Sequence, residues 1–128
     1  FLNWNKRLMF TASDQLNVTL ICGPTDMRKA IDGLCNIVAY DLEKEPCSEQ
    51  IFVFCGRARD KVKILQWASN GFWLHYKRLE KGHFQWPGID DEHLSIQVSP
   101  RQLNWLLDGL ALNLQEAHPH LTYRYHDD

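Results

Sequence analysis

The sequence has no long apolar run. Among its 128 residues no stretch of about 18 consecutive apolar residues occurs. The opening segment FLNWNKRL also lacks the apolar centre of a signal peptide, so we expect no membrane span and a cytoplasmic protein. The chain contains no glycine-rich phosphate loop and no readable Ser-His-Asp or Cys-His arrangement. These absences weaken any prediction of nucleotide-dependent or hydrolytic catalysis.

Cysteine is present, but without the spacing of a metal site. The four cysteines are Cys22, Cys35, Cys47 and Cys55. No pair has C-x-x-C spacing, and none stands at zinc-ligand spacing from a histidine. Cys22 and Cys35 lie in apolar runs, where a free thiol behaves as a small hydrophobic side chain. We therefore expect reduced cysteines, no bound metal and no cofactor.

Charge is unevenly spread along the chain. The formal net charge is only −2. Residues 56–86 nevertheless hold seven Lys or Arg against two acidic residues, a balance of +5, so the remainder carries −7. Such asymmetry suggests a face for an anionic partner, and the competing interpretation is an ordinary solvated charged face.

One stretch in the middle of the chain predicts four short strands joined by tight turns. The Asn-Gly pair at 70–71 is the strongest short hairpin signal, and a two-residue turn fixes the register of its strands. In that register Lys63 lies opposite Arg78, and a five-residue loop sets Phe54 beside Val62. The predicted strands are Ile51–Cys55, Lys61–Ala68, Phe72–Glu80 and His83–Trp86.

This predicted meander has two unlike faces. The apolar face requires helices laid over it; it comprises Phe52, Phe54, Val62, Ile64, Leu79, Phe84 and Trp86. The opposite face is basic, and with the adjoining loop it carries Arg57, Arg59, Lys61, Lys63 and Arg78, together with Tyr76. On the apolar face we expect Lys77 to lie over the ring of Trp86 as a cation–π pair.

The remaining segments predict two more strands and two helices. Thr25 is a candidate N-cap for the first helix, and Ser99 with Gln102 forms a capping box for the second. The elements are a strand at Gln15–Ile21, a helix from Asp26 to about Leu42, a strand at Leu94–Val98 and a helix from Pro100 to about Leu114. The predicted fold class is α+β: an antiparallel β-meander sheet with two α-helices packed on one face. We expect a domain over 9–114, an extension over 1–8 and a polar tail over 115–128.

The basic face provides the candidate site. Residues 57, 59, 61 and 63 alternate with period two, so an extended segment presents them all to one side. Together with Arg78 they suit phosphate contacts without sequence readout, and Tyr76 suits stacking on unpaired bases. No helix-turn-helix is evident. Arg28 and Lys29 either add to a binding site or form local salt bridges, for example between Arg28 and Asp32.

Catalytic and metal-binding alternatives rest on weaker patterns. A carboxylate triad could be drawn from Asp60, Asp90, Asp91 and Glu92. These residues lie on turns and an acidic loop, with no visible scaffold to bring them together on divalent metal ions. The H-x-H pair at 118–120 is a weak metal motif in a terminal segment. We therefore expect no enzyme and no metal site.

Three blocks of sequence together resemble a known family. They are Thr25–Leu34 (TDMRKAIDGL), Ile51–Leu65 (IFVFCGRARDKVKIL) and Trp67–Pro87, which contains NGFWL and KRLEKGHFQWP. Their order and spacing are similar to those of TnpB, the second open reading frame product of the IS sixty-six type of bacterial insertion sequences. The resemblance covers roughly residues 9–113. Cys55 stands where that family usually has arginine, which removes one basic side chain.

The resemblance implies an accessory role beside the transposase of the element and no established catalytic activity. Two hypotheses follow for the basic face. In the first, the protein is a module that binds DNA with low specificity. In the second, it is an interaction subunit that docks on the cognate transposase without contacting DNA. Neither the residues nor the resemblance indicates an oligomeric state.

Overall fold

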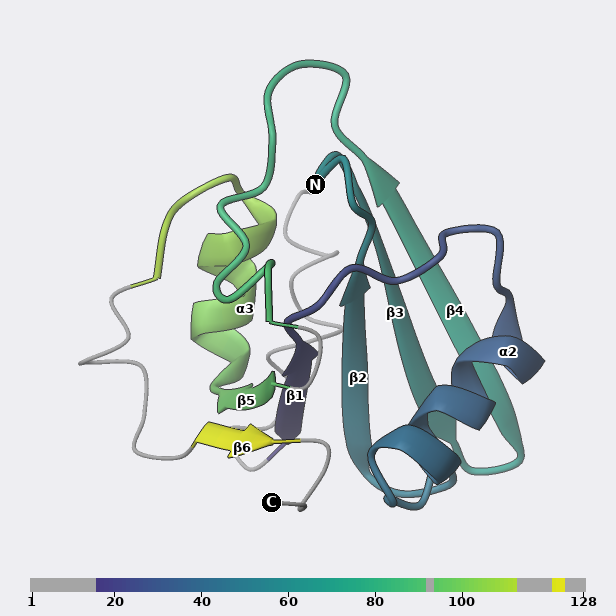
Figure 1. Ribbon diagram of the computed structural model, residues 1–128. Coiled ribbons are helices and arrows are strands. Elements are labelled where there is room, and N and C mark those ends of the chain that lie inside the picture. The colour runs from purple at the N-terminus through teal and green to yellow at the C-terminus, as the bar shows by residue number, and fades with distance from the viewer. Residues whose placement is uncertain (1–15, 92–93, 113–120, 124–128) are drawn as a thin grey trace, which may run out of the picture.

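The sheet forms the centre of the fold. The computed structural model describes residues 16–91, 94–112 and 121–123. Within these ranges six strands form one mixed sheet in the order β4-β3-β2-β1-β5-β6 (Figure 1). The elements are β1 (Asn17–Ile21), α2 (Ile31–Asn36), the π-helical segment η1 (Ile37–Asp41), β2 (Gln50–Cys55), β3 (Lys61–Ala68), β4 (Gly71–Arg78), β5 (Leu94–Val98), α3 (Pro100–Leu107) and β6 (Leu121–Tyr123).

One parallel pair interrupts an otherwise antiparallel sheet. β1 and β2 run parallel, with Val18 beside Ile51, while every other neighbouring pair is antiparallel. Parallel neighbours need a long crossover connection, and α2 with η1 supplies it. The α+β class is therefore confirmed, and the sheet is mixed rather than a pure meander.

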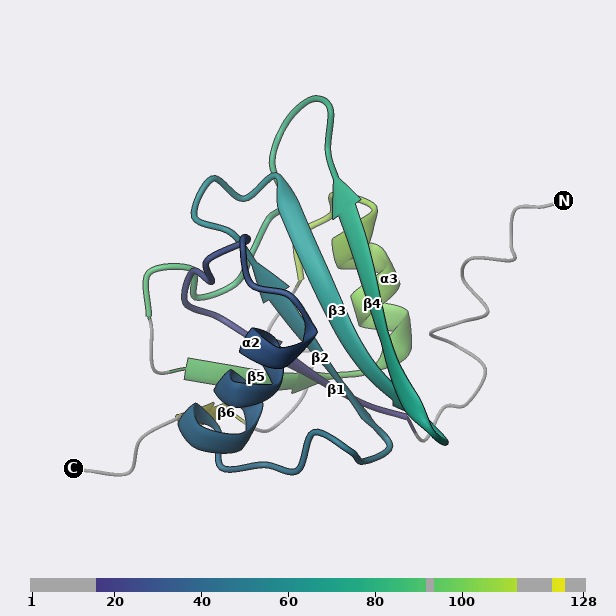
Figure 2. The same ribbon diagram turned by 90° about the vertical axis from the view of Figure 1, so that its right-hand side faces the viewer.

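The two helices cover opposite faces of the sheet, so the prediction that both pack on one face is wrong. Phe52 and Phe54 of β2 pack with Leu34 and Val38 on the α2 side. A second apolar cluster lies on the α3 side and comprises Val18, Leu20, Cys22, Ile51, Val53, Cys55, Val62, Ile64, Phe84, Trp86, Ile96, Val98, Leu103 and Leu106. Figures 1 and 2 show the sheet between α2 and α3. β2 is therefore buried on both faces, as its apolar run IFVFC requires.

The turn between β2 and β3 explains the difference. Cys55 pairs with Val62, and Phe54 with Lys63, one residue away from the predicted register. The Gly56 amide donates to the Lys61 carbonyl (3.1 Å), which leaves a four-residue turn. A slip of one residue moves side chains to the other face of a sheet. Phe54 therefore faces α2, while Val62 faces α3.

The β3–β4 hairpin is shifted by two residues, which leaves the faces unchanged. Ala68 pairs with Gly71, so the turn residues are Ser69 and Asn70 rather than the Asn-Gly pair. Ser69 takes the left-handed conformation, with φ 59°. Lys63 consequently faces Tyr76 instead of Arg78. Lys61, Lys63, Tyr76 and Arg78 still share one face, the α2 side.

The strand predicted at His83–Trp86 is wrong, because this segment is irregular chain. Two of its side chains pack into the apolar core on the α3 side. Phe84 and Trp86 are buried with ring centroids 6.5 Å apart. The Trp86 indole N–H donates to the Ile21 carbonyl oxygen (3.0 Å). The predicted pairing of Lys77 with Trp86 is wrong, because the Lys77 ammonium donates to the Leu107 carbonyl oxygen (2.8 Å).

The start of α3 agrees with the sequence, whereas the end of α3 and the start of α2 do not. Ser99 and Gln102 form the predicted capping box. The predicted helical end near Leu114 is wrong: α3 ends at Leu107, because Gly109 takes the left-handed conformation (φ 90°) that ends a helix. α2 begins only at Ile31, and residues 26–30 form turns and irregular chain. Thr25 is therefore not its N-cap.

Several predictions lie on residues that the structure does not describe. These are the extension over 1–8, Glu92, the last residues of the second predicted helix and the H-x-H pair at 118–120. Of the predicted tail, Leu121–Tyr123 forms β6 and pairs with β5. Within the described ranges, no helix has the length and apolar character needed to cross a membrane.

Candidate nucleic-acid interface

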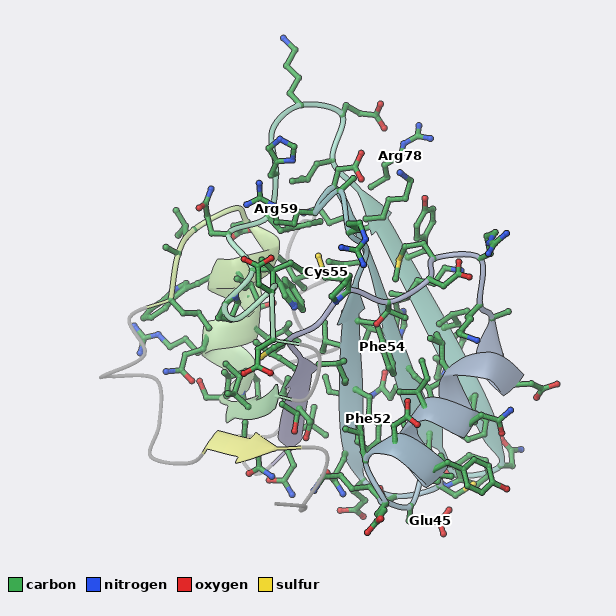
Figure 3. All side chains as sticks on the ribbon, in the orientation of Figure 1. Glu45, Phe52, Phe54, Cys55, Arg59 and Arg78 are labelled. Atoms are coloured by element: carbon green, nitrogen blue, oxygen red, sulfur yellow. The ribbon has the colours of Figure 1, made fainter. Side chains whose placement is uncertain are left out.

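Two turns meet at one end of the sheet. The β2–β3 turn and the loop after β4 lie side by side, because β2 ends where β3 begins and β4 returns to that same end. The Leu79 amide donates to the Asp60 carbonyl (2.7 Å), and the Phe84 amide donates to the Arg59 carbonyl (2.6 Å). We call the cations gathered there the basic end; they are Arg57, Arg59, Lys61, Arg78 and Lys81. Figure 3 shows Arg59 and Arg78 at this end.

The cations of the basic end differ in their partners. Arg78 pairs with Glu80 (3.0 Å), which raises the pKa of the guanidinium, and Lys61 pairs with Asp60 (3.2 Å). Arg57 and Arg59 make no ion pair with any residue of the described ranges. Exposed ion pairs are worth at most about 1 kcal/mol, so an incoming phosphate can compete for them. With five basic and two acidic residues over 56–61 and 78–83, the local formal charge is +3.

Tight packing fixes the position of the β2–β3 turn. A Cβ atom at Gly56 would lie 2.7 Å from the Met27 side chain, so only glycine fits without displacement. The Thr25 amide donates to the Cys55 carbonyl (2.8 Å). On the other side, the His83 ring nitrogen Nδ1 lies 2.9 Å from the Ala58 carbonyl oxygen. The turn that carries Arg57 is thus held from both sides.

Lys63 has a structural position rather than a solvent-facing one. Its ammonium donates to the carbonyl oxygens of Met27 (2.8 Å) and Lys29 (2.7 Å), 5.7 Å from the centroid of the Tyr76 ring. We call this arrangement the Lys63 clamp: Lys63, Tyr76 and the Met27 and Lys29 carbonyls. The clamp holds the segment before α2 across β3. The structure therefore separates Lys63 from the cations of the basic end.

Arg28 has a local acidic partner, but not the one expected. Its guanidinium donates to both carboxylate oxygens of Asp26, at 3.0 and 2.8 Å, instead of reaching Asp32. The Arg28 amide also donates to Asp26 Oδ1 (2.9 Å). These hydrogen bonds hold the pKa of Asp26 well below its usual range. The i to i+4 pairing with Asp32 fails because Arg28 precedes the helix; Lys29 is exposed beside it.

Aromatic side chains lie along the edge strand β4. Tyr76 is 53% exposed, with the Lys63 ammonium against its ring. Trp73 is 59% exposed on the α3 side, where its ring stacks with that of His75 at 6.1 Å. Burial lowers the pKa of His75, so its ring favours the neutral form. Sequence reasoning identified Tyr76 and missed Trp73, although the alternation along β4 places Trp73 on the face opposite Tyr76.

The opposite end of the sheet is acidic. The loop between η1 and β2 lies at the other end from the basic end, as the position of Glu45 in Figure 3 shows. Residues 41–49 carry four acidic side chains against Lys44, a formal charge of −3. The formal net charge is close to zero, but the two ends of the sheet therefore carry opposite charge.

Neither the carboxylates nor Cys55 extends the candidate site. Within the described ranges, no group of three or more His, Cys, Asp or Glu side chains is placed to hold a metal ion. Cys55 is buried in the α3-side core, and this burial raises its pKa to about 12. Position 55 therefore points inward, and its cysteine removes no exposed cation from the basic end.

The sequence identified most of the basic end. Arg57, Arg59, Lys61 and Arg78 were predicted, and the structure places them together. Lys81 was counted in the basic stretch but not selected; it is exposed on the loop after β4. The signal that could have identified it is its position in the Lys-Gly turn next to Arg78.

Comparison with known proteins identifies the family. The family described as "IS66 Orf2 like protein" matches residues 16–117, most of the chain. The chain belongs to the IS66 Orf2-like family. It is therefore an accessory protein of an insertion sequence, and the resemblance seen in its motifs is confirmed.

Two relatives come from Sinorhizobium fredii (strain NBRC 101917 / NGR234). The protein named "Uncharacterized protein y4hO" is 33% identical over 116 residues, covering 91% of this chain and 96% of the relative. The protein named "Uncharacterized protein y4jC" is 30% identical over 102 residues, covering 80% of this chain and 86% of the relative. No solved structure matches the chain.

Proposed function

We propose that this IS66 Orf2-like protein binds nucleic acid through the basic end and acts as a non-catalytic accessory protein in transposition. The observation that carries the proposal is the gathering of five cations by two turns that backbone hydrogen bonds hold together. Arg57, Arg59 and Lys81 form no ion pair within the described ranges, and Arg57 and Arg59 lead the group because they share the β2–β3 turn. Cations presented in this way bind phosphates and release counterions.

The shape of the basic end favours contacts to phosphate over contacts to bases. It consists of two turns, whereas readout of the major groove requires a helix or a two-stranded ribbon that enters it. Phosphate contacts position a protein without reading sequence. The proposed activity is therefore DNA binding with low sequence specificity. Asp60, the acidic residue of the turn, is engaged with Lys61 and receives no catalytic role.

Titration of labelled DNA at several salt concentrations tests the proposal. A duplex from an element end and a scrambled duplex should bind equally well. About four phosphate contacts would give a slope of roughly −4 for log affinity against log salt. Combining Arg57→Gln with Arg59→Gln should reduce the magnitude of that slope by about two.

A matched double variant controls for total charge. Lys44→Gln with Arg101→Gln removes the same charge at places remote from the basic end, on the acidic loop and on α3. This control should bind like the wild type. Undetectable binding at low salt, or equal losses in the two double variants, would contradict the proposal.

A second candidate function uses the same cations against an acidic surface of the cognate transposase. The observation that favours it is the lack of a groove-reading element among the two turns of the basic end. Capture of the purified transposase separates the two functions. If Arg57→Gln with Arg59→Gln abolishes capture while the wild type shows no DNA affinity, the docking function replaces DNA binding.

A further inference from the structure

Among the strands that the structure describes, β4 is the longer of the two that lie at an edge of the sheet. β4 has eight residues and ends the strand order, so its outer side pairs with no strand of the described ranges. Residues 71–76 contain no Lys, Arg, Asp or Glu. A long uncharged edge of this kind is a template for pairing with another strand.

The register shows which peptide groups face outward. The Leu79 amide donates to the Asp60 carbonyl, so this pair is hydrogen-bonded across the β3–β4 ladder. Hydrogen-bonded pairs alternate along an antiparallel ladder. The odd-numbered residues of β4 therefore turn their peptide groups toward β3. The even-numbered residues turn theirs to the open edge; they are Phe72, Leu74, Tyr76 and Arg78.

We propose that β4 pairs antiparallel with β4 of a second copy, about a twofold axis at His75, to form a dimer with one continuous sheet. In this register the residue numbers of each pair add to 150. Phe72 then faces Arg78 of the partner subunit, and Leu74 faces Tyr76 of the partner subunit. Both pairs occur twice by symmetry, so all four outward-facing residues are hydrogen-bonded. Sliding the strands by two residues in either direction removes one of these four pairs.

The antiparallel orientation is also favoured by charge. Like charges facing each other across an antiparallel pair are destabilising. Both cations of β4 lie at its C-terminal end, and both exposed aromatic side chains lie closer to its start or middle. In the proposed register Lys77 lies opposite Trp73 of the partner subunit, where its aliphatic stem can pack on the aromatic ring while its ammonium stays on the Leu107 carbonyl oxygen. No cation faces another.

Twofold pairing also closes the edge without starting a fibre. An isologous interface uses the same patch on both subunits and leaves no further copy of that patch open. The basic ends of the two subunits then lie at opposite ends of the shared sheet. This inference does not depend on nucleic-acid binding, because every contact in it comes from β4.

Sedimentation equilibrium of the full chain over a range of concentrations gives the first test. A dimer mass is expected, and a monomer at every concentration would overturn the proposal, including the case in which another segment of the same chain covers β4. Trp73→Arg and Trp73→Glu both replace the ring by a charge. Only the arginine faces Lys77 of the partner subunit with like charge, so its dimer dissociation constant should exceed that of the glutamate variant by roughly tenfold or more.

Disulfide trapping tests the register itself. At the twofold axis two copies of residue 75 form a non-hydrogen-bonded pair with Cα atoms about 4.5 Å apart, within the range a disulfide bridges. His75→Cys in a Cys47→Ser background, which removes the exposed native thiol, should cross-link rapidly on oxidation. Trp73→Cys in that background is the control: its side chain is more exposed, but its copies are four residues out of register. Equal cross-linking of the two variants would overturn the proposed pairing.

Discussion

Lys63 and Arg57 belong to one run of alternating cations, yet they occupy unlike surroundings. The Lys63 ammonium is held by two backbone carbonyls and lies against the Tyr76 ring. The Arg57 side chain is exposed on a turn and unpaired within the described ranges. The Lys63 clamp therefore supports the fold, whereas the basic end is available to a partner. A shared pattern in the sequence does not imply a shared role.

The largest effect on the free energy of unfolding is expected from a substitution in the apolar cluster on the α2 side of the sheet. Phe54 is fully buried with Leu34 on the α2 side. Phe54→Ala should reduce the free energy of unfolding by about 3–5 kcal/mol, because it leaves a cavity. Urea unfolding measures this loss.

A double-mutant cycle then tests which side of the sheet Phe54 occupies. Phe54→Ala and Leu34→Ala should couple by about 0.5 kcal/mol or more, since the two side chains share one core. Phe54→Ala and Val62→Ala should be nearly additive, because Val62 faces α3. If Phe54→Ala coupled with Val62→Ala and not with Leu34→Ala, the result would support the register predicted from sequence, with Phe54 beside Val62.

The clamp itself should produce the next largest effect. Lys63→Met keeps much of the stem but removes the donor to two carbonyls, so we expect a loss of about 1.5–3 kcal/mol in the free energy of unfolding. Lys61→Met is the matched control, on the same strand and face. Its half-exposed ion pair with Asp60 should contribute no more than about 1 kcal/mol. Equal losses would remove the distinction between clamp and basic end.

Local sequence predicted the elements better than their arrangement. β3 and β5 begin and end at the residues predicted, and the Ser99 capping box is present. These features depend on neighbours a few residues away. The parallel pairing of β1 with β2 joins segments about thirty residues apart, and no local pattern specifies it. The apolar run of β2 was assigned one buried face, although continuous apolar residues indicate burial on both.

The spacing of the charged residues predicted which cations of the candidate site share one face of the sheet. Alternation placed Lys61 and Lys63 on one face, which the structure confirms. It could not show that the backbone before α2 would bind Lys63, because the pattern there predicted a helix whose carbonyls bond within it. The sequence from His83 to Trp86 alternates like a strand. The structure has no strand there, because the rings of Phe84 and Trp86 pack in the apolar core.

The capping box of α3 is a stabilising contact between residues close in sequence, and it provides a comparison for the clamp. Ser99→Ala removes the side chain that accepts the Gln102 amide (3.1 Å) at the start of α3. The expected loss is about 1 kcal/mol in the free energy of unfolding. Ser99→Asp keeps an acceptor and should recover most of it, whereas an equal loss in both variants would mean that the hydroxyl does not cap α3.

The smallest effect on stability is expected where the effect on binding is proposed to be large. Arg57→Met should change the free energy of unfolding by no more than about 0.5 kcal/mol, because the exposed guanidinium is unpaired within the described ranges. The same variant should weaken DNA binding at low salt and reduce the salt slope by about one. Lys63→Met should show the reverse order, with a large loss of stability and little change in the affinity of the folded fraction. If Arg57→Met destabilises the protein as much as Lys63→Met does, Arg57 also supports the fold and the basic end loses its leading phosphate ligand.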